Sequence, residues 1–388
     1  KFEGVPEMIT ILGKDFDKKY LDKVKTLSLS PEAIQKEHDL KIVFTPLHGT
    51  TYELVPASLR NWGFTNIHTV PEQSIPDGDF PTVASANPEE PAAFKMALDL
   101  ARKIDADLAM ACDPDGDRIG IAVKNDAGEW TLLNGNQTNI IFTEYIIRRK
   151  KELNQLKGGE YTVKTIVTTE LIKDIAEKNH IICYDVYTGF KWIADVIRKE
   201  GGEKFIGGGE ESFGYMPGAF TRDKDGVSAT SLMAEIAAWV KMQNKTLYSF
   251  LKEIYAKYGF SQERMIYIVR KGLSGAQEIK AMMEEFRHNT PKEINHSPVV
   301  LKKDYLSLEA TNLQTGEKTH LNFETKSDVL QFFLADGSKI SVRPSGTEPK
   351  IKFYFEGRAQ MKDINDYERA QQDANARIDA IIKDLKLQ

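Results

Sequence analysis

The stretch 107-DLAMACDPDGDRIGIAV-123 indicates both a fold and a chemistry. Two apolar runs, 107-DLAMA-111 and 119-IGIAV-123, have the length and composition of buried strands, and the polar segment 112-CDPDGDR-118 joins them. Strand and helix patterns alternate on both sides of this stretch. The alternation predicts an α/β fold with a largely parallel sheet.

The same pattern restarts further along the chain and then changes character. A second series of strands and helices follows the turn 124-KNDAGE-129, and beyond about Ser261 the apolar residues alternate as in antiparallel strands. We therefore expect two α/β domains and a C-terminal α+β domain with an antiparallel sheet. The expected domain boundaries are 1–128, 129–261 and 262–388.

The composition is that of an ordinary globular protein. The chain has 388 residues, 41% hydrophobic and 28% charged, and a net charge of −5 with acids and bases well mixed. These values do not give the basic patch typical of nucleic-acid binding, and no apolar run approaches the roughly 18 residues of a membrane helix. We expect a cytoplasmic protein with two free buried thiols, Cys112 and Cys183. The chain begins without methionine, and we expect further sequence upstream.

Three aspartates in the joining segment predict a metal site. Asp113, Asp115 and Asp117 alternate, so an extended segment would place them on one side, and Pro114 and Gly116 allow the loop to curl. Carboxylates this close repel one another unless a cation lies among them, and oxygen ligands favour Mg²⁺ over Zn²⁺. A solvated acidic turn is the alternative. A calcium EF-hand loop is excluded, because it would need glycine at position 118 and a carboxylate at position 124.

Two further segments of the second α/β domain carry polar residues suited to a ligand. In 207-GGGEESFGY-215, serine stands where a dinucleotide-binding loop would have its third glycine, so a nicotinamide site is disfavoured. Glu210 and Ser212 at a strand end suit the hydroxyl groups of a polyol, although a glycine turn with a helix cap is the alternative. The segment 222-RDKDG-226 offers cations for an anionic group, or forms a solvated charge run.

The segment 343-RPSGTEPK-350 follows a strand in the C-terminal domain and suits a phosphate. Arg343 can bind a phosphate through two hydrogen bonds, Ser345 and Thr347 add hydroxyls, and Gly346 permits backbone N–H groups to converge on an anion. Taken alone the segment is more typical of a simple turn. Together with a hard-cation site and a polyol loop, it indicates a site for a phosphorylated sugar.

These segments resemble the α-D-phosphohexomutase family, which includes phosphoglucomutases and phosphomannomutases. The resemblance covers the whole chain and rests on D-P-D-G-D-R, G-E-E-S-F-G and R-P-S-G-T, in the family's order and spacing. Thr188-Gly189-Phe190-Lys191 is similar to a loop that touches the sugar in phosphoglucomutase-like members. The resemblance implies two phosphohexomutase-type α/β domains with mixed sheets, equivalent to family domains II and III, and a C-terminal domain equivalent to domain IV.

The resemblance also implies roles for the residues above. Mg²⁺ would bind to the three aspartates, Arg118 would contact the transferred phosphoryl group, and Lys224 would contact phosphate or handle a proton. The residues implied to bind the substrate are Thr188, Gly189, Lys191, Glu210, Ser212, Arg222, Arg343, Ser345, Gly346 and Thr347.

The family's first domain carries a phosphorylated serine in a Thr-Ala-Ser-His-Asn-Pro loop, and the present chain has no such loop. The segment 84-ASANP-88 imitates it, but Ser85 lies only 28 residues before Asp113, within the same expected domain. The family's nucleophile lies a whole domain earlier. We therefore interpret Ser85 as a loop residue and expect the 388-residue chain to be inactive by itself.

The resemblance implies a phosphohexomutase that interconverts hexose 1-phosphate and hexose 6-phosphate through a phosphoserine and a hexose 1,6-bisphosphate intermediate. Glucose phosphate is favoured and mannose phosphate is possible. The alternatives are a phosphopentomutase, a bisphosphate synthase, or a catalytically inactive sugar-phosphate binding module. The expected cofactors are Mg²⁺ and hexose 1,6-bisphosphate as activator. The expected partner is a phosphorylated sugar, with no nucleic acid and no membrane, in a monomer or homodimer.

Overall fold

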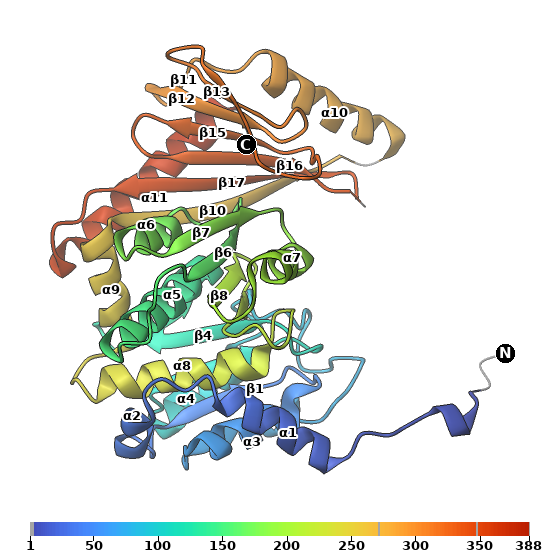
Figure 1. Ribbon diagram of the computed structural model, residues 1–388, viewed down its shortest axis with the longest axis vertical. Helices are drawn as coiled ribbons and strands as arrows, with labels where there is room; N and C mark the ends of the chain where they lie inside the picture. Colours follow the sequence, from blue (N-terminus) through green and yellow to red (C-terminus); the bar gives the residue numbers. More distant parts are fainter. Residues whose placement is uncertain (1–3, 271, 347, 388) are drawn as a thin grey trace. The chain divides into compact units, whose positions relative to one another are not determined.

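The structure is a computed structural model that describes residues 4–270, 272–346 and 348–387 (Figure 1). The chain divides into two compact units, each described here by itself. Unit 1 comprises Lys1–Thr168 and Ile172–Leu251, and unit 2 comprises Thr169–Leu171 and Lys252–Gln388.

The first sheet of unit 1 is mixed, with strand order β2-β1-β3-β4-β5. Strands β2, β1 and β3 are parallel, whereas β4 and β5 are antiparallel to their neighbours. Strands β1 and β3 are buried along their whole length, as expected for parallel strands covered on both faces. The strands are β1 (Ile42–Thr45), β2 (Ile67–Thr69), β3 (Leu108–Cys112), β4 (Ile119–Lys124) and β5 (Trp130–Leu133).

The second sheet of unit 1 is also mixed, with strand order β7-β6-β8-β9. Strands β7, β6 and β8 are parallel, and β9 pairs with β8 in the antiparallel sense. In this sheet the carboxyl ends of β6, β7 and β8 therefore lie at one edge. The strands are β6 (Tyr161–Thr165), β7 (Ile182–Val186), β8 (Phe205–Glu210) and β9 (Gly214–Met216).

Two buried helices hold the sheets of unit 1 in place. Helix α8 (Gly226–Lys241) is buried over Gly226–Val240, because it packs against β3 and β4 of the first sheet and β9 of the second. Helix α5 (Gly135–Glu152) packs on β8 so closely that a Cβ at Gly209 would lie 2.0 Å from Asn139 Oδ1. This packing accounts for glycine at that position of β8.

The remaining helices between Pro6 and Tyr258 are short or amphipathic. Helix α1 packs on α3, and α4 packs on β1 and β3. They are η1 (Pro6–Met8), α1 (Lys14–Lys25), α2 (Pro31–Lys36), α3 (Thr51–Trp62), η2 (Pro71–Gln73), α4 (Lys95–Ile104), α6 (Leu171–Lys178), α7 (Phe190–Glu200) and α9 (Leu247–Tyr258).

Unit 2 is built on an antiparallel sheet with strand order β10-β17-β16-β15-β12-β13-β14, and β11 pairs with β12. One apolar cluster contains residues of α10, of α11 and of the central strands, so both helices pack on the same face of the sheet. The elements are β10 (Phe260–Val269), α10 (Gly272–His288), β11 (Glu293–Ile294), β12 (Ser297–Asp304), β13 (Glu309–Asn312), β14 (Lys318–His320), β15 (Leu330–Leu334), β16 (Lys339–Pro344), β17 (Lys350–Ala359), η3 (Ile364–Asp366) and α11 (Tyr367–Asp384).

The expected fold class is confirmed, with two mixed α/β sheets and a third, antiparallel sheet. Four strands have no counterpart in the prediction: β10 and β11 in unit 2, and β5 and β9 in unit 1. Strands β5 and β9 are short and follow a turn directly, and each adds an antiparallel edge to a sheet whose other strands were expected. Cys112 and Cys183 are free thiols, but only Cys112 is fully buried. Within the described residues, no helix combines the length and the apolar content that crossing a bilayer requires.

Candidate active site

The three aspartates lie in the turn of the hairpin formed by β3 and β4. The N–H of Gly116 donates to the carbonyl of Asp113 at 3.0 Å, and Gly116 adopts a φ of 77°. The segment therefore curls, as Pro114 and Gly116 suggested, and is not extended. One carboxylate oxygen from each of Asp113, Asp115 and Asp117 lies within 4.8 Å of the others. The expected convergence is present, and metal binding at this cluster remains a prediction.

The electrostatics of the cluster fit a divalent cation. Burial raises the pKa of Asp113 to about 7, and the negative charges of Asp117 and Asp115 act in the same direction. The Oδ1 atom of Asp113 accepts hydrogen bonds from the N–H groups of Asp117 and Arg118 at 3.1 and 2.9 Å. A cation among the three carboxylates would favour their charged forms. Three hard oxygen donors with room for further ligands suit Mg²⁺.

Arg118 and Lys224 bring positive charge to the cluster. The Nη1 atom of Arg118 donates to Glu89 Oε1 at 3.0 Å, and its Nε atom lies 3.5 Å from Asp113 Oδ2. Lys224 Nζ contacts Oδ2 of Asp117. Both predicted catalytic residues therefore lie beside the predicted metal ligands.

The segment that carries Lys224 is anchored at the start of α8. The carboxylate of Asp225 caps that helix by accepting from the N–H groups of Val227 and Ser228. The hydroxyl of Tyr20 donates to the same carboxylate at 2.7 Å. In addition, the N–H of Gly226 donates to the carbonyl of Gly116 at 3.0 Å. These bonds hold the lysine segment against the aspartate turn.

The predicted sugar loop is a tight turn between β8 and β9. Glu210 ends β8, and its carboxylate accepts hydrogen bonds from the N–H of Gly189 at 2.5 Å and from the hydroxyl of Ser212 at 3.4 Å. Burial raises the pKa of Glu210 to about 7, helped by the charge of Glu211. Three predicted substrate-binding residues are thereby brought together. Gly189 has a φ of 116°, which glycine adopts without strain.

Backbone bonds connect the sugar loop to the aspartate turn. The N–H of Ile119 donates to the carbonyl of Phe213 at 2.9 Å, and Arg118 pairs with Gly214 as an isolated bridge. The two predicted loops of unit 1 thus belong to one continuous site.

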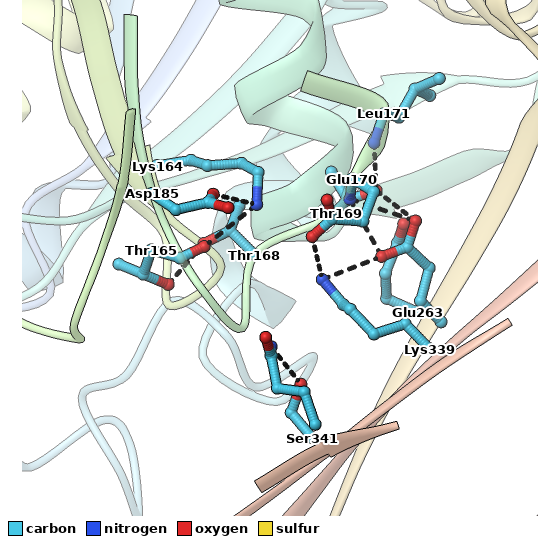
Figure 2. Close-up of polar contacts among 12 residues, drawn as sticks. Lys164, Thr165, Thr168, Thr169, Glu170, Leu171, Asp185, Glu263, Lys339 and Ser341 are labelled. Carbon is cyan, nitrogen blue, oxygen red and sulfur yellow. Dashed lines mark hydrogen bonds and ion pairs between the residues drawn. The ribbon is translucent and has the colours of Figure 1, made fainter. Parts of the chain in front are cut away.

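Residues behind the sugar loop were missed by sequence reasoning. The carboxylate of Glu211 accepts hydrogen bonds from the hydroxyls of Thr165 and Thr168 at 3.2 and 3.1 Å. Next to them, fully buried Lys164 lies 2.7 Å from Asp185, and Figure 2 shows the two side chains pointing toward each other. The one signal in the sequence was a charged residue within the apolar strand 163-VKTIVT-168.

The side chains of two further predicted residues of unit 1 contact other groups. The Nζ atom of Lys191 lies over the ring of Trp192, 4.9 Å from its centroid. Exposed Arg222 donates from Nε to the carbonyl of Ala219 at 2.8 Å. Within the part of the chain that the structure describes, neither side chain hydrogen-bonds to another predicted site residue. Thr188 precedes Gly189 and is half-buried.

The predicted phosphate loop of unit 2 joins β16 to β17. Arg343 lies near the end of β16, and the N–H of Ser345 donates to the carbonyl of Lys350 at 2.7 Å. The hydroxyl of Ser345 accepts from the N–H of Glu348 at 3.3 Å. A Cβ at Gly346 would meet no atom within 4 Å, so packing does not require glycine there. Thr347 lies outside the described residues.

Ser85 lies in the loop before α4. Its hydroxyl donates to Glu90 Oε1 at 2.9 Å, and the side chain of nearby Asn87 accepts from the N–H of Glu89 at 3.0 Å. These are short-range bonds within one turn-rich segment, as expected for a loop residue.

The chain was compared with known protein families. Residues 18–128 match the family described as phosphoglucomutase/phosphomannomutase, alpha/beta/alpha domain II, and residues 134–258 match domain III of the same family. Residues 280–371 match its C-terminal domain. Each matched range contains one of the three predicted loops.

Curated relatives include phosphoglucomutases from Staphylococcus aureus strains N315 and USA300. Each is 38% identical over 317 residues, which amount to 81% of this chain and 56% of the relative. The chain therefore spans little more than half the length of these relatives.

Solved structures with the same fold include the open form of parafusin, a phosphoglucomutase from Paramecium. Its TM-score is 0.64 at 18% identity, covering 96% of this chain and 61% of that one. A phosphomannomutase of Thermus thermophilus, itself assigned provisionally, gives a TM-score of 0.62 at 17% identity, covering 95% and 65%.

Proposed function

The chain belongs to the α-D-phosphohexomutase family, and from this premise we propose that it forms most of a phosphoglucomutase active site. The proposed reaction moves a phosphoryl group between the C1 and C6 oxygens of a hexose through a hexose 1,6-bisphosphate. One observation carries the proposal: the aspartate turn, Lys224 and the sugar loop are bonded into one site. That site would offer carboxylates for a cation beside hydrogen-bonding groups for a sugar.

Mg²⁺ would bind to the carboxylates of Asp113, Asp115 and Asp117, whose clustered oxygens fit a hard cation. When bound, it would neutralise negative charge on the transferred phosphoryl group.

Arg118 and Lys224 would complete the phosphoryl site with positive charge. Arg118 is oriented by Glu89, so its guanidinium is held in place before substrate binds. Lys224 lies on an anchored segment and contacts Asp117, and its ammonium could contact the phosphoryl group or pass a proton to the leaving oxygen. Both side chains are positioned by bonds that exist without the substrate, and such preorganisation lowers the cost of reaching the transition state.

Glu210 and Ser212 would bind the ring hydroxyls. Burial and the negative charge of Glu211 raise the pKa of the Glu210 carboxylate. Sugar hydroxyls would donate to it and favour its charged form. Because the intermediate must turn over between two half-reactions, these groups would accept the sugar in both orientations. Thr188, Gly189, Lys191 and Arg222 would line the same substrate site.

Arg343, Ser345, Gly346 and Thr347 would bind the phosphate that does not react. Arg343 lies near the end of a strand of a packed sheet, which suits a residue that positions a substrate. We infer that the phosphoryl acceptor lies outside these 388 residues, because the only serine loop that resembles the family's belongs to the turn around Ser85.

Glucose phosphate is the proposed substrate because the relatives at 38% identity are named phosphoglucomutases and because the sugar loop reads Glu-Glu-Ser-Phe-Gly. The test is steady-state kinetics of the full-length protein with Mg²⁺ and a catalytic amount of glucose 1,6-bisphosphate. The 1-phosphates of glucose, mannose and ribose are compared. The highest kcat/KM is expected for glucose 1-phosphate. Absence of turnover with every hexose 1-phosphate would overturn the proposal, and a preference for ribose 1-phosphate would reassign the substrate.

A further inference from the structure

The sugar loop between β8 and β9 has a backbone conformation that its surroundings must hold in place. Phe213 adopts a φ of 66°, a left-handed conformation that few residues other than glycine adopt without strain. Such a conformation persists only where neighbouring contacts enforce it. Glu210 and Ser212, the two predicted ligands of the ring hydroxyls, lie within three residues of Phe213. Their positions therefore depend on whatever supports the loop.

Helix α5 supports the backbone of this loop. A Cβ on Gly135, the first residue of the helix, would lie 2.0 Å from the carbonyl oxygen of Glu211 and 2.8 Å from the nitrogen of Phe213. One turn later, the side chain of Asn139 is buried and donates from Nδ2 to the carbonyl of Glu210 at 2.7 Å. These contacts fix the main chain of the loop. They leave the side chain of Glu211 to be held by other groups.

Two threonines at and after the end of β6 hold that side chain. Thr165 and Thr168 are completely buried, and their hydroxyl oxygens lie 2.8 Å apart. Both hydroxyls donate to Oε2 of Glu211, at 3.2 and 3.1 Å. They lie beside the ion pair of Lys164 with Asp185, which Figure 2 shows. The carboxylate of Glu211 is thus bonded to a buried strand end.

Electrostatic repulsion opposes this arrangement. The negative charge of Glu211 adds to burial in raising the pKa of Glu210 to about 7, whereas the charge of Lys224 acts in the opposite direction. The two adjacent carboxylates repel each other, so Glu211 would be better solvated if its side chain turned toward water. The threonine hydroxyls keep it near Glu210 at that electrostatic cost. Packing alone does not require a charged group there, and a glutamate held in this way indicates a role in placing its neighbour.

We propose that Thr165 and Thr168 are positioning residues for the sugar loop, acting through Glu211. They hold Glu210 and Ser212 in the place where the ring hydroxyls of the substrate bind. This role rests on the proposed function, because it takes the ligand to be a sugar phosphate. It adds to the site two buried hydroxyls that lie behind the loop. Without these hydroxyls, Glu211 would turn away and the loop would no longer present Glu210 in one fixed direction.

The direct test is the ionisation of Glu210 in the 388-residue chain, followed by ¹³C NMR of labelled glutamate carboxyl groups. The Glu210 signal is assigned by its loss in Glu210→Gln. In Thr165→Val and in Thr168→Val, the pKa of Glu210 should fall from about 7 toward its ordinary value, because Glu211 turns away. Thr165→Ser and Thr168→Ser keep the hydroxyls and should behave as the wild type.

Thr162→Val is the matched control. Thr162 lies in the same strand, is buried and donates its hydroxyl to the carbonyl of Gly207 at 2.7 Å. Its replacement removes a buried hydroxyl of β6 that serves a different group. The control should therefore keep the wild-type pKa of Glu210, even where its melting midpoint falls as much as in the other two valine variants.

A second readout is substrate discrimination by the full-length protein. The 2-, 3- and 4-deoxy analogues of glucose 1-phosphate each lack one ring hydroxyl. The wild type should lose roughly tenfold or more in kcat/KM with the analogue whose missing hydroxyl binds Glu210. In the double variant Thr165→Val/Thr168→Val, kcat/KM for glucose 1-phosphate should fall roughly tenfold, and that analogue should lose little more. A merely structural effect would lower both substrates equally and preserve the wild-type ratio.

Unchanged titration of Glu210 in both valine variants would overturn the role of the threonines, whatever the kinetics show. So would a double variant that discriminates against the deoxy analogues as strongly as the wild type. If the wild type converts no hexose phosphate while the titration of Glu210 still depends on both hydroxyls, the proposed function fails and the positioning of Glu210 by the threonines stands.

Discussion

Lys224 Nζ contacts the carboxylate of Asp117, the last of the three clustered aspartates. This ammonium supplies part of the positive charge that a metal would supply, so lysine and metal compete electrostatically for the same carboxylate. In the 388-residue chain, Lys224→Met should therefore bind Mg²⁺ several-fold more tightly than the wild type by calorimetry. In the full-length protein the same variant should lose turnover by roughly 10²–10⁴-fold, the range for a lost acid–base group. Weaker Mg²⁺ binding in the variant would contradict this competition.

Asp115 offers a clean probe of the metal site. Its side chain is exposed, so replacing it should cost little stability. Asp115→Asn should abolish the heat of Mg²⁺ binding while the melting midpoint stays within about 2 °C of the wild type. Asp39→Asn, another exposed aspartate, serves as control. Equal Mg²⁺ binding in the wild type and Asp115→Asn would show that the cluster is a solvated turn.

Gly49 tests whether the position of the aspartate turn matters for turnover. A Cβ on Gly49 would lie 2.3 Å from Cα of Pro114, so alanine there must displace the turn. We expect Gly49→Ala to lower kcat/KM of the full-length protein at least about tenfold, since small misplacements of reacting groups are costly. Gly78→Ala is the matched control, because a Cβ there would meet no atom within 4 Å. Equal activity in both variants would show that the position of the aspartate turn does not affect turnover.

The raised pKa of Glu210 predicts that the stability of the chain depends on pH. Burial raises its pKa to about 7 in the folded chain from 4.5, so the folded state binds the proton more tightly than the unfolded state. Its stabilising contribution is thus present below pH 4.5 and is lost as the pH rises through 7. We expect the free energy of unfolding of the wild type, measured with urea, to fall between pH 5 and 8. This residue should account for up to about 3 kcal/mol of the fall. That loss should be absent in Glu210→Gln and present in Glu203→Gln, an exposed control. The same pH slope in Glu210→Gln as in the wild type would refute the assignment.

Structural features that depend on a local sequence pattern were predicted correctly. Ile351, Phe353 and Phe355 alternate in the sequence and share one core cluster in the structure. The three aspartates converge because proline and glycine permit a turn, and both residues were visible in advance. Strands β5 and β9 were missed because strands of three or four residues carry too little periodicity to detect.

Residues that act through tertiary contacts were beyond sequence reasoning. The hydroxyls of Thr165 and Thr168 bond to Glu211, more than forty residues later in the chain, and no local pattern specifies that bond. Arg222 was selected as part of a cationic segment and Lys191 by resemblance, and the structure gives their side chains neighbours outside the predicted site.

Ser85 should be dispensable for turnover. Its hydroxyl bonds to Glu90 within the same loop, so replacing it removes one local hydrogen bond worth about 1 kcal/mol. Ser85→Ala in the full-length protein should keep kcat within about twofold of the wild type in a coupled assay of glucose 6-phosphate formation. A fall of a hundredfold or more would identify Ser85 as a reacting group.

Mass spectrometry after incubation with glucose 1,6-bisphosphate tests most directly which serine of the protein accepts the phosphoryl group. The 388-residue chain and the full-length protein are treated alike in the presence of Mg²⁺, digested and searched for phosphoserine. We predict a phosphoserine in the full-length protein at a position outside these 388 residues, and none in the 388-residue chain. A stable phosphoryl group on Ser85 in either protein would contradict the account, because the loop before α4 would then carry the nucleophile.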